Sequence, residues 1–425
     1  MNHRFLILLP NLDVFQFFIL IVITICWAGP VKAKEIYFQP SIGIRTEYDD
    51  NKRLSTESSL PGIDKSAYAV ITRANAKLGM RSSNYELELD NQLIINRYQS
   101  EFDLDSEDFN INLTTSYSLT ERSRLGLSGN FTQDTTLTSE LDATGTGLVQ
   151  DNVIRQQWSI TPNWSYSLSN TQFLQTNYTH SEITYEESER GSFVDYSIDN
   201  ISLSFRQQWT SLLSNTLSLS AMSFKIPKIG SGIFESSRET TEYSVNIGVD
   251  YQISPTWSTS LTVGQRFTNT ETTQKFNFTT LTFDDVTTSD DVSGLIFSFS
   301  VDKQFYSGSA GLEYSRSTSA QSQGQLQINE RVEANYNYKV NARLQLSLTG
   351  GMNETSISGS EDNDNGRTYF NIRPSVRWTF NQQTNITVAY QYRTQTFESN
   401  NEEAVSNSVS LNFNYQWDKL ATQRY

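Results

Sequence analysis

The chain has 425 residues, with 32 Lys and Arg against 47 Asp and Glu, one Cys and a mean hydropathy of -0.48. Its 24 Phe, 21 Tyr and 7 Trp exclude a disordered acidic polymer, and its 8 Pro and 21 Gly exclude a collagen-like or polyproline chain. The formal net charge of -15 argues against nucleic acid as a partner, because phosphate binding requires a basic surface.

The first 33 residues are predicted to be a secretory signal peptide. Arg4 precedes an apolar run over residues 14–28, which is short for a helix that spans a bilayer. Val31-Lys32-Ala33 supplies the small residues of a cleavage site, so we expect the mature chain to begin at Lys34. This start predicts export, and no later apolar run reaches the length of a transmembrane helix.

Lipid attachment at Cys26 is the alternative reading of the N-terminus. Ile25 precedes it, where a lipoprotein signal would have a small residue. Cleavage after Ala33 removes the single cysteine, so the mature protein, which we expect to be one domain of residues 34–425, has no disulfide.

Alternation with a period of two runs through the mature chain. Apolar residues occupy one parity and polar residues the other, which places the two sets on opposite faces of a strand. The clearest examples are Tyr243, Val245, Ile247, Val249, Tyr251 and Ile253; Leu344, Leu346 and Leu348; and Val409, Leu411, Phe413, Tyr415 and Trp417. These stretches are long enough for the roughly 9 to 11 residues with which a tilted strand crosses a membrane.

The connections between these stretches alternate between short polar turns and longer polar loops. Short turns are predicted near Ser83, Arg122, Asn170, Leu213, Pro255, Phe305, Ala342 and Gln383. Longer loops are predicted at 50–66, 99–106, 137–151, 186–193, 229–238, 273–289, 321–324, 358–366 and 399–403. The pattern predicts an all-β, transmembrane, antiparallel up-and-down β-barrel of about 18 strands (about 16 to 18), with short periplasmic turns and long extracellular loops.

A soluble β-helix or a string of β-sandwich modules is the alternative architecture. A sandwich requires apolar cores separated by linkers, and a β-helix has a shorter repeat, whereas here the apolar parity is spread evenly. Aromatic residues beside the short turns also favour a membrane barrel, since they would form an interfacial girdle. These are Trp158, Trp164, Tyr166, Trp209, Tyr251, Trp257, Trp378, Phe380, Tyr415 and Trp417.

The polar parity is predicted to line the lumen. The candidate lumen-lining residues are Arg45, Arg73, Arg206, Arg266, Arg373, Arg377, Arg393, Glu86, Glu88 and Glu242. A barrel of this strand number leaves a wet lumen whose charges either pair across strands or steer solutes. Arg373, Arg377 and Arg393 form a candidate anion-guiding cluster.

The acidic excess falls in the predicted loops, where it is either simply solvated or binds divalent cations that bridge to lipopolysaccharide. Pairs such as Asp290-Asp291 belong to this set. Asp362-Asn363-Asp364-Asn365-Gly366 resembles the start of a calcium loop, but the closing Glu is missing, so we predict no metal site. We also predict no cofactor.

Enzymatic chemistry would depend on His180, the only His of the mature chain. Its parity directs it outward, and Ser181 falls on the opposite face, where it cannot serve as its nucleophile. The sequence contains no His or Cys cluster with metal-ligand spacing and no phosphate-binding Gly-rich loop. We therefore predict no catalytic residue.

The first predicted strand ends Glu47-Tyr48-Asp49-Asp50-Asn51, and hairpins such as Ser118-Leu119-Thr120-Glu121-Arg122 follow at intervals. The Tyr-x-Asp-Asn ending resembles the opening of the β-barrel porin 2 group and of the outer-membrane barrels associated with exosortase and exopolysaccharide genes. The C-terminus departs from the usual barrel pattern, because residues 418–424 separate Trp417 from the terminal Tyr425. The resemblance implies a role in moving or anchoring a secreted polysaccharide.

Three functions remain open at the level of sequence. The first is a porin-like outer-membrane channel that assists exopolysaccharide export, the second a non-conducting structural or adhesion barrel, and the third a hydrolase that depends on His180. The expected partners are outer-membrane lipid and lipopolysaccharide, the barrel-assembly machinery, and exopolysaccharide with its periplasmic export components. The expected location is the outer membrane of a Gram-negative cell.

Cleavage of the signal peptide can be tested directly. We expect N-terminal sequencing and intact mass of the protein isolated from outer membranes to give a chain that begins at Lys34. A mass that includes a diacylated Cys26 would instead support the lipoprotein alternative.

Overall fold

The computed structural model describes residues 35–56, 65–99, 104–142, 152–186, 193–229, 235–276, 285–320, 326–357, 366–397 and 401–423. The predicted signal peptide and the Asp362–Asn365 part of the calcium-like sequence lie outside the described residues. Within them, no helix is long and apolar enough to cross a membrane. A π-helical turn, Leu137–Asp142, lies among the described residues.

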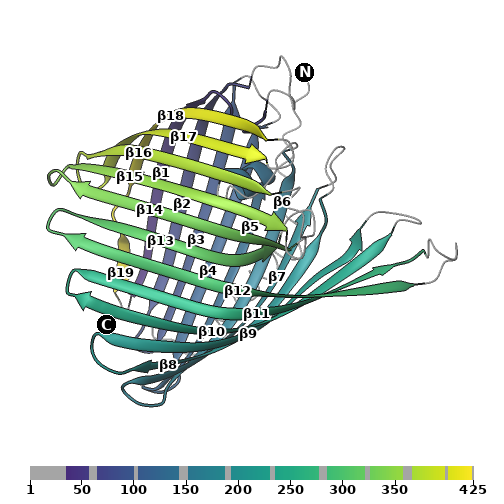
Figure 1. The fold of residues 1–425 in the computed structure, drawn as a ribbon. Coiled ribbons are helices and arrows are strands. Elements are labelled where there is room, and N and C mark those ends of the chain that lie inside the picture. The colour runs from purple at the N-terminus through teal and green to yellow at the C-terminus, as the bar shows by residue number, and fades with distance from the viewer. Residues whose placement is uncertain are drawn as a thin grey trace.

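Eighteen long strands form one antiparallel sheet that closes on itself (Figure 1). They are β1 (Glu35–Asp49), β2 (Ala67–Arg81), β3 (Tyr85–Tyr98), β4 (Ser106–Ser118), β5 (Ser123–Thr135), β6 (Ile154–Ser167), β7 (Gln172–Tyr185), β8 (Tyr196–Gln208), β9 (Leu213–Ile229), β10 (Ser236–Ser254), β11 (Trp257–Gln274), β12 (Val286–Phe305), β13 (Gly308–Ala320), β14 (Leu326–Lys339), β15 (Leu344–Ile357), β16 (Arg367–Thr379), β17 (Thr384–Phe397) and β18 (Glu402–Gln416). Each pairs with its neighbours in chain order, and β1 pairs with β18. The prediction of an 18-stranded up-and-down barrel is confirmed.

A nineteenth short strand, β19 (Leu420–Gln423), continues β18 along the same edge of β1. Pairing of β1 with β18 ends at Ser41 opposite Gln416, and β19 resumes it at Phe38 opposite Leu420. Pro40 lies at the break, where its missing N–H costs no ladder bond, and its carbonyl accepts the Trp417 N–H at 3.1 Å. The residues after Trp417 therefore belong to the barrel wall.

The eight short turns join the end of each even-numbered strand from β2 to β16 to the next odd-numbered strand. All eight predicted turn positions lie in these turns or directly beside them, from Ser83 between β2 and β3 to Gln383 between β16 and β17. Glu35 pairs with Arg81, so the first described residue of the wall also lies at this short-turn end. The strand ends that the longer connections join lie at the opposite end of the barrel, which we call the long-connector end. In outer-membrane barrels these two ends face the periplasm and the exterior, respectively.

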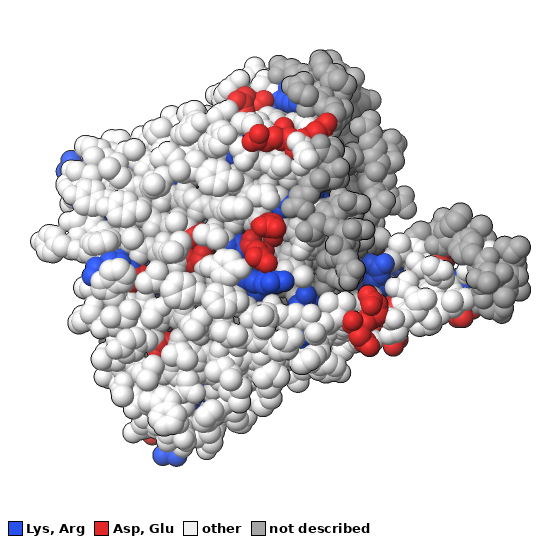
Figure 2. All heavy atoms as spheres, in the orientation of Figure 1, with Lys and Arg blue, Asp and Glu red and all other residues white. Residues whose placement is uncertain are grey.

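The apolar parity of the strands faces outward. On β10, Tyr243 and Ile247 are both 58% exposed, and the same parity carries Val245, Val249 and Tyr251. Figure 2 shows an outer face that is mostly uncharged, with acidic and basic residues in small adjacent patches. A soluble sandwich would bury this parity, whereas a transmembrane barrel presents it to lipid. The alternative soluble architecture is therefore wrong.

Most of the aromatic residues predicted for the girdle lie near the short-turn end. Trp164 stacks on Tyr166 with ring centroids 5.8 Å apart, and Lys303 lies 4.6 Å above the Trp257 ring. Trp158 was expected in the same girdle, but it lies nearer the long-connector end of β6, with its ring centroid 4.9 Å from that of His180. The prediction was wrong for Trp158 because parity fixes the face of a strand and not the depth.

Strands β9–β12 are the longest, and their ends extend away from the neighbouring wall in Figure 1. Pairing of β12 with β13 ends at Phe297 opposite Arg316, whereas β12 stays paired with β11 as far as Val286. Asp290 and Asp291 were predicted in a loop, and they lie instead inside β12. Their polarity misled the prediction because this part of the strand rises above the apolar band.

The short-turn end of the first hairpin is locked by Tyr37 of β1 over Gly79 of β2. The two residues are directly paired, and a Cβ at Gly79 would overlap the Tyr37 ring. The Tyr37 hydroxyl donates to Glu88 of β3 at 2.8 Å, and Lys419 lies 3.9 Å above the ring. One aromatic side chain thus ties together β1, β2, β3 and the C-terminal segment.

Gly79→Ala should lower the free energy of unfolding by about 1 to 3 kcal/mol, because the added methyl displaces the Tyr37 ring. Urea unfolding of the protein refolded in lipid vesicles, followed by tryptophan fluorescence, measures the change. Gly350→Ala is the matched control, since a Cβ there meets ordinary contacts at 3.5 Å or more. Equal effects of the two substitutions would contradict the role given to Tyr37.

Candidate functional site

The inward face of the wall is lined mainly by hydroxyl and amide side chains that hydrogen-bond across strands. Asn75 bridges Ser41 and Gln92 on the first three strands, with N–O distances of 3.0 and 2.7 Å. Similar bonds recur around the barrel: Asn130 to Asn112, Ser220 with Ser244, Ser260 with Ser300, Ser347 to Asn337 and Asn414 to Asn385. The wall therefore presents neutral donors and acceptors to the lumen.

The predicted lumen-lining acids are all paired. Glu86 bonds Arg81 and lies 3.7 Å from Arg124, while Glu88 lies 2.7 Å from Lys77. Glu242 lies 3.5 Å from Arg266 and also accepts a bond from Thr268. These contacts join adjacent strands, or β3 to β5 in the case of Glu86 and Arg124, so the acids brace the wall.

Among the predicted basic residues, Arg206 lies 3.3 Å from Asp250, and Arg45 bonds Glu47. Arg206 lines a cavity of about 910 Å³ at the short-turn end, together with Ser214, Asp250 and Asp302. The cavity is lined mainly by polar side chains, and Arg206 within it is paired with Asp250.

The predicted cluster of Arg373, Arg377 and Arg393 is not a single cluster. Arg393 is 2% exposed and donates to Asp49 at 2.6 Å, so it is committed to a buried ion pair. Arg377 is exposed nearer the short-turn end and donates to Thr387 at 3.4 Å. Arg373 instead lies within electrostatic range of Arg45 and Glu47. Sequence reasoning grouped the three because they share a parity.

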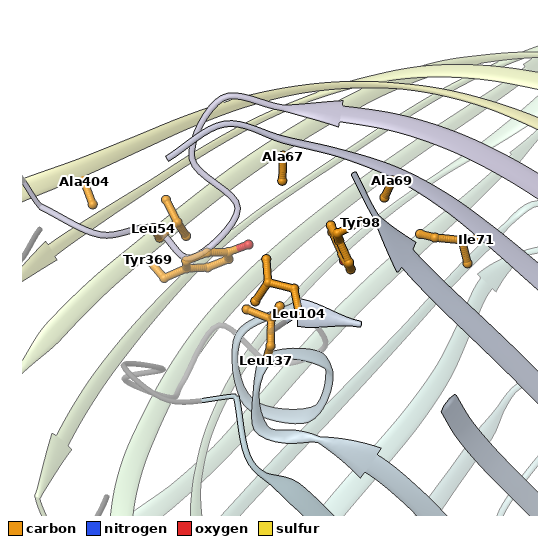
Figure 3. Close-up of a cluster of buried hydrophobic side chains, with 9 residues drawn as sticks. All are labelled: Leu54, Ala67, Ala69, Ile71, Tyr98, Leu104, Leu137, Tyr369 and Ala404. Atoms are coloured by element: carbon orange, nitrogen blue, oxygen red, sulfur yellow. The ribbon is translucent and has the colours of Figure 1, made fainter. Parts of the chain in front are cut away.

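An apolar cluster fills part of the lumen near the long-connector end (Figure 3). We call it the plug; its buried members are Leu54, Ala67, Ala69, Ile71, Tyr98, Leu104, Leu137, Tyr369 and Ala404. Leu54, Leu104 and Leu137 come from connecting segments, and each is 3% exposed or less. These connections were predicted to be wet loops. Their isolated leucines were the signal that could have shown that part of each folds inward.

The Asp49-Asp50-Asn51 sequence at the end of β1 holds the plug segment in place. The Asp49 carboxylate accepts bonds from Arg393 and Ser406, and the Asn51 side chain bonds the backbone of Ser55 and of Val405. The turn places Leu54 at a φ of 49°, a left-handed conformation that Leu rarely adopts. The chain is thereby directed into the lumen.

Asp50 closes the barrel at the same level. Its carboxylate accepts the backbone N–H of Asn407 at 2.6 Å and the Asn407 side-chain amide at 2.9 Å. These bonds supplement the ladder between β1 and β18, the first and last long strands. Asp50 and Asn51, the Asp-Asn pair of the Tyr-x-Asp-Asn ending, therefore have a structural role in this chain.

A second inward cluster lies on the opposite part of the wall. Ile183, Tyr196, Phe224 and Ile226 from β7, β8 and β9 pack with Leu326 at the start of β14. Since β14 is five strands beyond β9 in the sheet, this contact spans the interior. The described interior is therefore narrowed at the long-connector end from two sides.

His180 lies on the outward face, as its parity predicted. Its Nδ1 lies 2.8 Å from Asp199, which also accepts the Tyr178 hydroxyl at 2.6 Å. In the described part of the chain, no hydroxyl is hydrogen-bonded to its other ring nitrogen, and Ser181 is buried on the opposite face. The contacts describe a polar group near the outer rim. No group of three His, Cys, Asp or Glu side chains in the described ranges is arranged to hold a metal ion.

Comparisons with known proteins give structural likenesses of low identity. No protein-family model matches the sequence, and no curated protein matches it. Similar solved structures include OccAB3 of Acinetobacter baumannii, with 11% identity over 90% of this chain and 99% of that one and a TM-score of 0.47. The ferric-catecholate import receptor Fiu of E. coli gives 9% identity over 89% and 81% of the chains, with a TM-score of 0.47. The FrpB iron transporter of Neisseria meningitidis gives 9% identity over 93% of this chain and 83% of that one, with a TM-score of 0.44.

The closed 18-stranded wall and its outward apolar band define the class of this protein as an outer-membrane β-barrel. Its interior combines a polar wall with two apolar restrictions near one end. The resemblance to exopolysaccharide-associated barrels stays a prediction.

Arg393→Gln should lower the free energy of unfolding by about 3 to 5 kcal/mol, because it leaves the Asp49 carboxylate buried without its cation. Urea unfolding in vesicles measures the effect. Arg206→Gln is the matched control: its pair with Asp250 is about half exposed, so the expected cost is below about 1 kcal/mol. A small effect at Arg393 would show that the pair does not hold the segment.

Proposed function

We propose that this protein is a porin-like channel through which a hydrophilic solute diffuses, with an exopolysaccharide chain as the leading candidate. The observation that supports this function is the inward wall of Ser, Thr, Asn and Gln side chains bonded across strands. Sugar hydroxyls both donate and accept hydrogen bonds, as these side chains do, so a glycan can exchange bonds with the wall as it moves.

The channel performs no chemistry on its solute. Near the short-turn end, the charged residues of the inward wall are mostly held in ion pairs across strands. Hydration and hydrogen bonding are therefore the main contacts of a passing chain. The plug and the second inward cluster restrict passage at the long-connector end. The sequence Tyr48-Asp49-Asp50-Asn51, which resembles the strand ending of exopolysaccharide-associated barrels, supports polysaccharide as the solute class. Periplasmic export components are the proposed partners of the channel.

A non-conducting structural or adhesion barrel is the second candidate. The observation that favours it is the apolar packing of Leu54, Leu104 and Leu137 inside the lumen, which stabilises a narrowed interior. In this function only the long connections would meet surface polymer, and lipid with lipopolysaccharide would surround the wall.

The two candidates differ in conductance. We expect the refolded mature protein in a planar bilayer to give conductance steps, and the triple substitution of Leu54, Leu104 and Leu137 by Ser to raise the conductance or the open time, because it removes apolar contacts of the plug. Leu125→Ser, on the outward face, is the control and should leave the conductance unchanged.

Folding is checked by the electrophoretic shift between heated and unheated samples. If neither the wild type nor the triple variant conducts, although both show the electrophoretic shift of a folded barrel, the channel function is contradicted and the structural or adhesion barrel is favoured.

A further inference from the structure

Two inward arginines, Arg73 of β2 and Arg373 of β16, differ from the other predicted lumen cations. In the described part of the chain, neither is hydrogen-bonded to an acidic side chain, although both are partly buried. Arg45, Arg206, Arg266 and Arg393 each have a bonded or ion-paired carboxylate, whereas Arg377, which bonds Thr387, is exposed to solvent.

Strand register brings these arginines together with Arg45. Arg45 pairs with Ile71, and Arg73 pairs with Gly43, so the two guanidinium groups are diagonal neighbours on the inward face of one hairpin. Arg73 lies within electrostatic range of both Arg45 and Arg373, and Arg373 lies within range of Arg45. Three strands thus contribute one group of cations.

The group lies directly beneath the plug. On β2, the next inward residue after Arg73 toward the long-connector end is Ile71, which belongs to the plug. On β16, the inward residues after Arg373 in the same direction are Asn371 and then Tyr369, and Tyr369 also belongs to the plug. The polar wall therefore meets the restriction at this group of arginines.

The nearby acids, Glu47 and Asp108, are not hydrogen-bonded to Arg73 or Arg373 in the described part of the chain. Glu47 bonds both Arg45 and Lys52, and Asp108 accepts a bond from Asn96 at 2.8 Å and is 5% exposed. Guanidinium groups held partly away from water without a bonded anion are costly, and an oxyanion with two oxygens fits their fork of donors. On β15, the inward position diagonal to Arg373 is Gly351, where an added Cβ would meet only ordinary contacts, so space remains beside Arg373.

We propose that Arg45, Arg73 and Arg373 form an oxyanion-binding site that holds a carboxylate or phosphate group carried by the passing solute. The inference rests on the proposed channel function and narrows its solute class from hydrophilic chains to anionic ones. A bound anionic group would wait beneath the plug before it passes the restriction.

The test is isothermal titration calorimetry of the refolded full-length mature protein with tetragalacturonate, inorganic phosphate and neutral maltotetraose. We expect wild type to bind tetragalacturonate, to bind phosphate more weakly and to ignore maltotetraose. The double variant Arg73→Gln/Arg373→Gln should weaken binding by about tenfold or more. The double variant Arg81→Gln/Arg377→Gln, which changes arginines of the same two strands and the same face nearer the short-turn end, should keep it.

Absence of binding to wild type, or equal loss in the two double variants, would overturn the site. Phosphate binding as tight as that of tetragalacturonate would overturn its assignment to a group carried on a chain. Calorimetry does not depend on conduction, so a conducting protein that binds no anion contradicts this inference alone. A folded protein that is silent in bilayers contradicts the proposed function.

Discussion

Backbone hydrogen bonding is the constraint on which the rest of this structure depends. In a bilayer every strand needs a partner on both sides, because an unpaired N–H or C=O has no water to bond. The chain meets this requirement by closing β1 against β18 and β19, with Pro40 at the one break in that seam and Asp50 bonded to Asn407 at its far end. Most of the described strand length is paired on both sides, and the longest stretch without a second partner is the edge of β12 from Val286 to Ile296, where pairing with β13 has ended.

Closure also explains the position of the plug. The residues that close the seam, Asp49 to Asn51, are continuous with the segment that carries Leu54 into the lumen, and the carboxylate of Asp49 bonds Arg393 on β17. Disruption of the plug segment would therefore weaken the contacts between the closing strands, and disruption of those contacts would displace the plug segment. Barrel stability and restriction of the lumen share the same few buried polar contacts.

The distribution of charge divides the lumen into two regions. At the short-turn end, ion pairs such as Arg206 with Asp250 leave a wall that is close to neutral. Beneath the plug, Arg73 and Arg373 have no bonded acid among the described residues, so positive charge is concentrated where the interior narrows. A field concentrated at a restriction acts on every solute that reaches it, whereas the same charges in a wide vestibule would be screened by water.

The sequence by itself determined the fold class, the strand number, the eight short turns and the face on which each side chain lies. These follow from local rules: a strand alternates its faces, and a short polar segment turns the chain. Depth and proximity were decided only by the tertiary structure. Strand register brings Arg393 into an ion pair with Asp49 and separates it from Arg373. Inward folding buries Leu54 and Leu104, although their segments have the polar composition of loops. Pairs such as Asp49 and Arg393, 344 residues apart, become neighbours only when the sheet closes, and no local pattern encodes that closure.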